Sequence, residues 1–207
     1  MKAKIRAKIF ETATLIALSA TMLITSAFSE KQAALAEKII RLHVVAASDS
    51  DADQSLKLRV RDAVLAVLAE PLSQAVTRGE ALAAAERLLP EIEAAAREEI
   101  ARSGFGYSVA ATLESERFPT RVYDDFTLPA GVYESLRITI GSGAGTNWWC
   151  VVFPALCREA ATEEQTEAAF SALSGGEIKL ITDGSGGVKI KFRLFEGISK
   201  LKKLLGK

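Results

Sequence analysis

The sequence predicts an α+β fold, a mixed β-sheet with two main helices packed on one face, in a single domain after an N-terminal export segment. Three observations predict it. An apolar, β-branched run at 39–46 is typical of a buried strand, helical periodicity fills most of 51–102, and short alternating runs separated by Pro and Gly fill 107–153. Helices and strands that cluster separately along the chain favour α+β over a regular α/β alternation.

Residues 1–36 have the layout of a signal peptide or a membrane anchor. Basic residues precede a mainly apolar run at 12–28, and a polar, Ala-rich stretch follows. Two candidate cleavage motifs with small residues are present, Ala27-Phe28-Ser29 and Ala34-Leu35-Ala36. The second is closer to the A-x-A form that precedes signal-peptide cleavage. Cleavage there, with Ala34 and Ala36 as the recognised residues, starts the mature chain at Glu37. An uncleaved anchor is the alternative.

The globular domain is predicted at 37–173. The strand at 39–46 ends in a polar turn, and Asp51 with Gln54 has the spacing of a capping box for a helix that reaches Pro71. A second helix is predicted at 80–102, with Gly104 as its stop. Four strands are then expected at 107–113, 120–123, 132–140 and 148–153, followed by a short helix at 162–173.

Residues 174–207 are predicted to form a Gly-rich turn, a strand and a basic amphipathic C-terminal helix. Seven basic residues against Glu196 give residues 189–207 a net charge of +6. Such a helix can lie on an anionic membrane surface. A terminal helix docked on the domain with a solvated basic face is the simpler interpretation.

The charge balance of the mature chain excludes general nucleic-acid binding. The first 36 residues hold five of the 26 basic and two of the 26 acidic residues, which leaves 21 basic and 24 acidic and a net charge of −3. A nucleic-acid binder needs a basic surface that displaces counterions from phosphates.

Both tryptophans and both cysteines lie in one stretch, residues 147–157. In an exported protein, Cys150 and Cys157 are most simply interpreted as a disulfide. Six residues of extended chain between them would hold the sulfurs too far apart, so the chain must reverse, and Pro154 is placed to turn it. Strand alternation sends Trp148 and Trp149 to opposite faces, which leaves one of them as a candidate anchor for a partner.

Catalytic and metal chemistry find little support. The one His of the chain, His43, could pair with Cys150 as an extracytoplasmic cysteine hydrolase, but a histidine in an apolar strand is more often structural. One His and two Cys leave a zinc ion short of ligands. Asp49, Asp51 and Asp53 have the alternate spacing of the first ligands in a calcium-binding loop. The later ligands of such a loop are missing, so capping of the following helix explains these acidic residues better. No metal and no cofactor are expected, and the glycines at 141–145 are predicted to form a flexible hairpin turn.

Three stretches together resemble the stage II sporulation protein R family of endospore-forming bacteria. They are residues 40–50 (IRLHVVAASDS), the elements FPTR, LPAGVY and LRI within 118–138, and residues 141–157 (GSGAGTNWWCVVFPALC). The resemblance spans about 39–157 and includes the ending after Val188. Two positions depart from it, since Ala47 stands where the family commonly has Asn and Ala155 where a second Pro is common.

The resemblance implies a signalling protein rather than an enzyme. Its members are expected to be secreted from the forespore into the space between the two septal membranes. There they activate a membrane-embedded aspartic protease of the mother cell, which processes the precursor of the sporulation sigma factor E. By hypothesis, the partner contacts lie at His43, Asp49, Asn147, Trp148 and Trp149, on a loop shaped by the disulfide.

Overall fold

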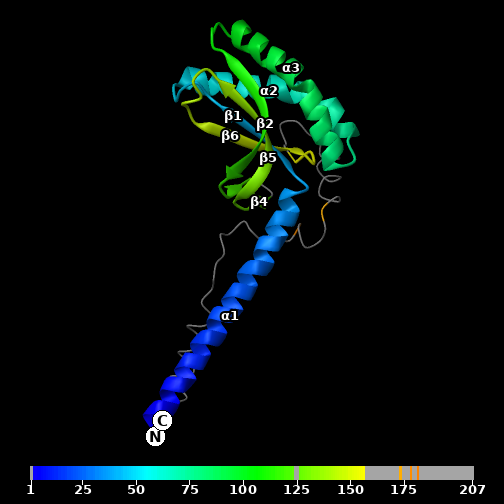
Figure 1. The fold of residues 1–207 in the computed structure, drawn as a ribbon. Helices are drawn as coiled ribbons and strands as arrows, with labels where there is room; N and C mark the ends of the chain where they lie inside the picture. The colour runs from blue at the N-terminus through cyan, green and yellow to red at the C-terminus, as the bar shows by residue number, and fades with distance from the viewer. Residues whose placement is uncertain (1, 124–125, 157–172, 174–177, 179–180, 182–207) are drawn as a thin grey trace.

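The computed structural model describes residues 2–123, 126–156, 173, 178 and 181. Its first element, α1 (Lys2–Ala36), projects away from a domain built of two further helices and a β-sheet (Figure 1). Among the described residues, no helix combines the length and the apolar character needed to cross a membrane. The prediction of a signal peptide or anchor for 1–36 thus stays a prediction.

The sheet has four strands in the order β2-β5-β1-β6. These are β1 (Ile40–Val45), β2 (Val109–Phe118), β5 (Gly131–Ile140) and β6 (Asn147–Phe153). β1 runs parallel to β5 and antiparallel to β6, while β2 is antiparallel to β5. The predicted mixed sheet is confirmed, and the first strand of the domain lies in its interior, where both edges of β1 are paired.

Two helices pack on one face of this sheet, as predicted (Figure 1). α2 (Asp51–Gln74) and α3 (Arg78–Arg102) bury apolar side chains against the strands in a first core. Two details differ from expectation. Ser50 rather than Asp51 caps α2, because its hydroxyl accepts the Asp53 N–H at 3.2 Å, and the helix continues past Pro71 to Gln74.

The opposite face of the sheet carries a second core at one end. A short hairpin, β3 (Arg121–Val122) with β4 (Thr127–Leu128), covers this end; the β4 half was not predicted because two residues show no periodicity. The buried side chains come from α1 and the residues just after it, the sheet, the hairpin, the turn after β6 and two residues later in the chain, and they are Leu35, Ile39, Phe118, Phe126, Leu128, Tyr133, Val151, Leu156, Leu173 and Ile181. Each face of the sheet therefore has its own apolar cluster.

The glycine-rich loop at 141–145 is not the hairpin turn that the sequence suggested. It joins β5 to β6, and these strands are separated by β1, so the loop crosses the end of β1. Gly145 donates its N–H to the Ala46 carbonyl at 2.9 Å, and a Cβ on it would lie 2.3 Å from the Ser48 carbonyl oxygen. The close approach to the chain after β1 explains a glycine here better than flexibility does.

Several predictions fall outside the described residues. They are the helix at 162–173 and the tail at 174–207, apart from Leu173, Ile178 and Ile181, and also Cys157. The membrane contact of the basic C-terminal helix therefore stays a prediction.

Candidate partner-binding face

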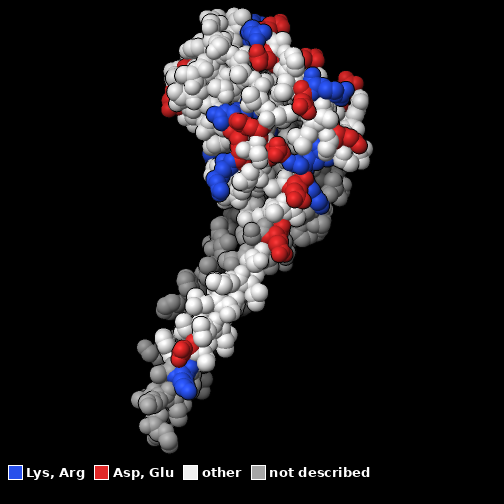
Figure 2. Space-filling view, viewed as in Figure 1, with Lys and Arg blue, Asp and Glu red and all other residues white. Residues whose placement is uncertain are grey.

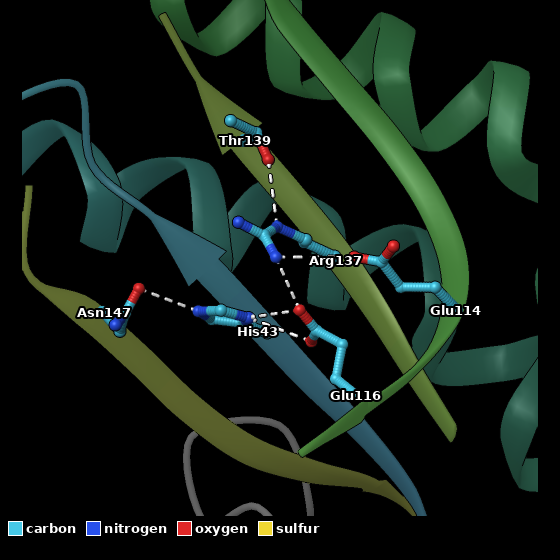
Figure 3. Close-up of polar contacts among 6 residues, drawn as sticks. All are labelled: His43, Glu114, Glu116, Arg137, Thr139 and Asn147. Carbon is cyan, nitrogen blue, oxygen red and sulfur yellow. Dashed lines mark hydrogen bonds and ion pairs between the residues drawn. The ribbon is translucent and has the colours of Figure 1, made fainter. Parts of the chain in front are cut away.

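Strand alternation divides the residues of β1 between two environments. Leu42 and Val44 belong to the first core beneath the helices. Arg41 and His43 therefore point to the opposite face. There His43 lies near side chains of the other three strands. We call the set His43, Glu116, Arg137, Asn147 and Trp149 the polar face (Figure 3).

His43 is held between two partners from the two edge strands. Its Nδ1 lies 3.0 Å from Glu116 Oε2 on β2, and its Nε2 lies 2.8 Å from Asn147 Oδ1 on β6. A carboxylate only accepts hydrogen bonds, so Nδ1 carries the proton, while the Asn147 amide can present either its oxygen or its nitrogen to Nε2. His43 is only 7% exposed and both ring nitrogens are engaged, which fixes the ring orientation.

Arg137 extends the network towards solvent. Its Nη1 donates to Glu116 Oε1 at 2.6 Å and lies 3.5 Å from Glu114 Oε1, while Nε donates to Thr139 at 3.4 Å (Figure 3). Burial acts to raise the pKa of Glu116, but the bonds from His43 and Arg137 outweigh it and lower that pKa. Glu116 is therefore a carboxylate held ionised by its neighbours on β1 and β5.

Trp149 forms the aromatic part of the polar face. Its ring stacks on His43 with centroids 5.5 Å apart, and the Arg121 guanidinium carbon lies 3.6 Å from its centroid. The ring of Phe118 meets it edge-on at 6.4 Å. Trp149 also packs partly against the second core, so it joins the charged network to the aromatic end of the sheet.

Trp148 lies on the other face, as strand alternation predicts. It pairs in register with Val44 and packs against the first core, with the Arg61 guanidinium of α2 4.7 Å from its ring. The two tryptophans thus lie on opposite faces of the sheet. Their rings do not form one continuous patch that a single partner could cover.

Asp49 has a local partner rather than a place on the polar face. One of its carboxylate oxygens accepts the Thr146 N–H at 2.6 Å and the Thr146 hydroxyl at 2.5 Å. These bonds to Thr146 lower the pKa of Asp49. Asp49 ties the corner before α2 to the loop that leads into β6, and so fixes where Asn147 begins the strand.

Cys150 is buried in the first core, in register with Leu42, and so points away from His43. The two side chains are on opposite faces, and the Cys150–His43 pair that the hydrolase alternative needs is not formed. The chain does turn at Pro154, where the Leu156 N–H meets the Pro154 carbonyl at 2.7 Å. The Cys150–Cys157 disulfide stays a prediction, because Cys157 lies outside the described residues.

Arg41, on the same side of β1 as His43, is fully buried among aromatic rings. Its guanidinium donates to the Tyr123 hydroxyl at 2.7 Å and lies 4.0 Å from the Phe118 ring centroid and 5.2 Å from that of Tyr133. Burial lowers the pKa of Arg41. Sequence reasoning missed this residue together with Glu116, Arg121 and Arg137.

Those residues had only a weak signal in the sequence. The alternation Thr112, Glu114, Glu116 and Phe118 gives a charged side to β2, but nothing in the sequence says that this side faces His43, which lies 73 residues away. Ala34 and Ala36, the predicted cleavage residues, lie in the last turn of α1. Within the described ranges, no group of His, Cys, Asp and Glu could hold a metal ion.

Fold and face together define a single-domain α+β protein whose sheet has one apolar, helix-covered face and one charged, aromatic face. The family model for stage II sporulation protein R matches residues 36–163. The chain is also 34% identical to stage II sporulation protein R of Bacillus subtilis (strain 168) over 196 residues, which cover 86% of this chain and 88% of the relative. No solved structure gives a significant match. The chain belongs to the stage II sporulation protein R family, and the resemblance seen in the sequence is confirmed.

Proposed function

We propose that this chain is an intercellular signalling protein of endospore formation that acts as a protease activator. It is secreted across the forespore membrane into the intermembrane space, where it binds a membrane-embedded aspartic protease of the mother cell. Binding promotes cleavage of the sigma factor E precursor. The chain acts as a ligand and not as a catalyst.

The observation that carries the proposal is the gathering of three predicted contact residues. His43, Asn147 and Trp149 come from two strands and meet on one face, where Glu116 and Arg137 hold them in place. The Arg137 side chain is 35% exposed and that of Glu114 is 44% exposed, so charge from this network reaches solvent. Tryptophan and arginine are enriched among residues that dominate binding energy at interfaces.

The proposed activation needs only a small difference in binding free energy between the active and inactive states of the protease. A ligand activates by binding the active state more tightly than the inactive one, and a tenfold activation needs about 1.4 kcal/mol of differential affinity. One tryptophan placed in a partner's pocket commonly contributes about 2 kcal/mol or more. Because the ring of Trp149 is already held between His43 and Arg121, little conformational entropy remains to be lost on binding.

Charge on the domain also suits a protein partner rather than nucleic acid. On the side in view, acidic and basic side chains are interspersed over the domain, and no large basic patch forms (Figure 2). Mixed charge of this kind gives orientation and specificity to protein contacts.

Reconstitution tests the proposal. The full chain is co-expressed in a non-sporulating bacterium with the protease and the sigma precursor, and precursor cleavage is followed by immunoblot. We expect cleavage only when all three proteins are present. An exported, folded chain that leaves the precursor intact would argue against the signalling role.

A variant in the same assay distinguishes the signalling ligand from the cysteine-hydrolase alternative. Cys150→Ser keeps the polar face and removes the thiol, so a ligand should keep its activity once the amount of exported protein is matched. Loss of precursor cleavage by a Cys150→Ser protein that unfolds at the wild-type temperature would support thiol chemistry instead.

A further inference from the structure

The junction between α1 and the domain is a continuous, packed structure. The last turn of α1 closes with hydrogen bonds from Glu37 N–H to Ala33 O at 3.0 Å and from Lys38 N–H to Leu35 O at 3.1 Å. Residue 40 then begins β1, the strand in the interior of the sheet. The helix thus passes directly into the domain, without a linker of several residues.

Leu35 marks where the helix joins the domain. It is 0% exposed and belongs to the second core, as does Ile39. Apolar side chains that are described further up the helix are exposed instead, and those of Ile16 and Leu23 are 69% and 72% exposed. The helix therefore changes from an exposed rod to a core element within its last turn.

We propose that the last turn of α1 belongs to the folded domain and is retained in the mature protein, so that the chain is not cut between Ala36 and Glu37. Cleavage there would remove Leu35 from the second core and leave a cavity in that cluster. Processing further upstream leaves this turn in place.

The backbone geometry opposes the same cut. Proteases commonly bind substrates as extended strands that pair with the edge of a sheet. To present residues 34–36 in this form, the folded chain would have to break the hydrogen bonds that close α1 and withdraw the buried side chain of Leu35. The Ala34-Leu35-Ala36 motif, attractive in sequence, is therefore unsuited to cleavage once the domain has folded.

Retention of the whole of α1, without processing upstream, would have a structural consequence that does not depend on the proposed function. α1 has 35 residues, which at 1.5 Å per residue is a rod about 50 Å long. From Thr12 to Ser29 the helix carries no charged residue, and the described part of this stretch shows none on the side in view (Figure 2). A retained α1 would hold the domain at the end of this rod, with the second core as the fixed point.

The first test is the N-terminus of the exported protein. The full chain is expressed in a bacterium that exports it, recovered from the membrane and extracytoplasmic fractions, and its N-terminus is determined by intact mass and N-terminal sequencing. We expect every folded product to include Leu35. A stable product that begins at Glu37 would overturn the proposal.

The second test measures the packing of Leu35 in the full chain. Leu35→Ala and the matched control Leu23→Ala are purified in the same mild detergent, and thermal unfolding is followed by tryptophan fluorescence. We expect Leu35→Ala to lower Tm by about 5–15 °C and Leu23→Ala to change it by less than about 2 °C. Equal Tm values for the two variants would contradict a core role for the last turn.

Discussion

The two faces of the sheet are built from alternating residues of the same strands, yet they differ in chemistry. Beneath α2 and α3, the strands contribute Leu42, Val44, Leu136 and Ile138, all fully buried. On the opposite face, the intervening positions of β1 and β5 contribute charged and polar groups, which need partners on other strands to be accommodated.

This difference separates the side chains that stabilise the fold from those that folding does not need. Apolar burial stabilises a domain without specific partners, whereas a buried ion pair is often no more stabilising than apolar residues of similar size. Apolar burial in the first core under the helices and in the second core at one end of the opposite face therefore accounts for most of the stability. A polar face with a fixed histidine, a shared carboxylate and a stacked tryptophan is better explained by binding.

Two neighbouring residues of β5, one on each face of the sheet, are expected to differ most in their contribution to stability. Leu136 is fully buried in the first core, and Arg137 is its polar-face neighbour with a 35% exposed side chain. We expect Leu136→Ala to lower the free energy of unfolding by about 3–5 kcal/mol and Arg137→Ala by about 1 kcal/mol or less. Urea denaturation measures both, and equal losses would erase the proposed division between the faces.

Tyr133, a residue of the second core, is expected to make the stability of the domain depend on alkaline pH. Burial raises its pKa to about 12, against about 10 in an unfolded chain. A raised folded pKa means that its contribution is complete below pH 10 and is lost as the pH rises towards 12, a loss of about 2–3 kcal/mol.

The matching variants are Tyr133→Phe and Tyr107→Phe. Denaturation between pH 9 and 12 should show that Tyr133→Phe removes most of this alkaline loss, although it also removes the bond to the Pro129 carbonyl. Tyr107 is exposed at the other end of the sheet, so Tyr107→Phe should leave most of the loss in place. An alkaline profile unchanged by Tyr133→Phe would show that this phenol is not the buried group.

Glu116 tests the polar network at acid pH, with a smaller effect. Its folded pKa is depressed, so its contribution is present above the unfolded pKa near 4.3 and is lost as the pH falls through the folded value. We expect Glu116→Gln to cost about 1–2 kcal/mol at pH 7 and to flatten the acid limb. Glu114→Gln, more exposed and 3.5 Å from Arg137, is the control and should cost less than about 0.5 kcal/mol. Indistinguishable variants would mean that the network does not hold Glu116.

The main elements of the fold could be predicted because they depend on local pattern. The strand at 39–46, both long helices and the four later strands are confirmed as β1, α2, α3, β2, β3, β5 and β6, although β2 continues five residues past its predicted end at 113. The order of strands could not be predicted, because it depends on pairing between distant segments. This is why the sequence predicts a hairpin turn at 141–145, although β1 lies between β5 and β6 in the sheet.

The candidate site could be predicted in part for the same reason. His43, Asn147 and Trp149 stand out by residue type and position, and alternation separates Trp149 from Trp148. Glu116 and Arg137 look like ordinary surface charges until the register of β2 and β5 brings them to His43. Nothing in the local pattern singles out Arg41, which the fold buries among aromatic rings.

The most direct test compares Trp149→Ala with Trp148→Ala in the reconstituted cleavage assay, at equal amounts of exported protein whose folding is checked by thermal unfolding. If the polar face binds the protease, Trp149→Ala should lower precursor cleavage at limiting dose about tenfold or more, and Trp148→Ala should stay within about twofold of wild type. Wild-type cleavage by a folded Trp149→Ala protein, with loss in Trp148→Ala, would place the contact on the other face and contradict the account.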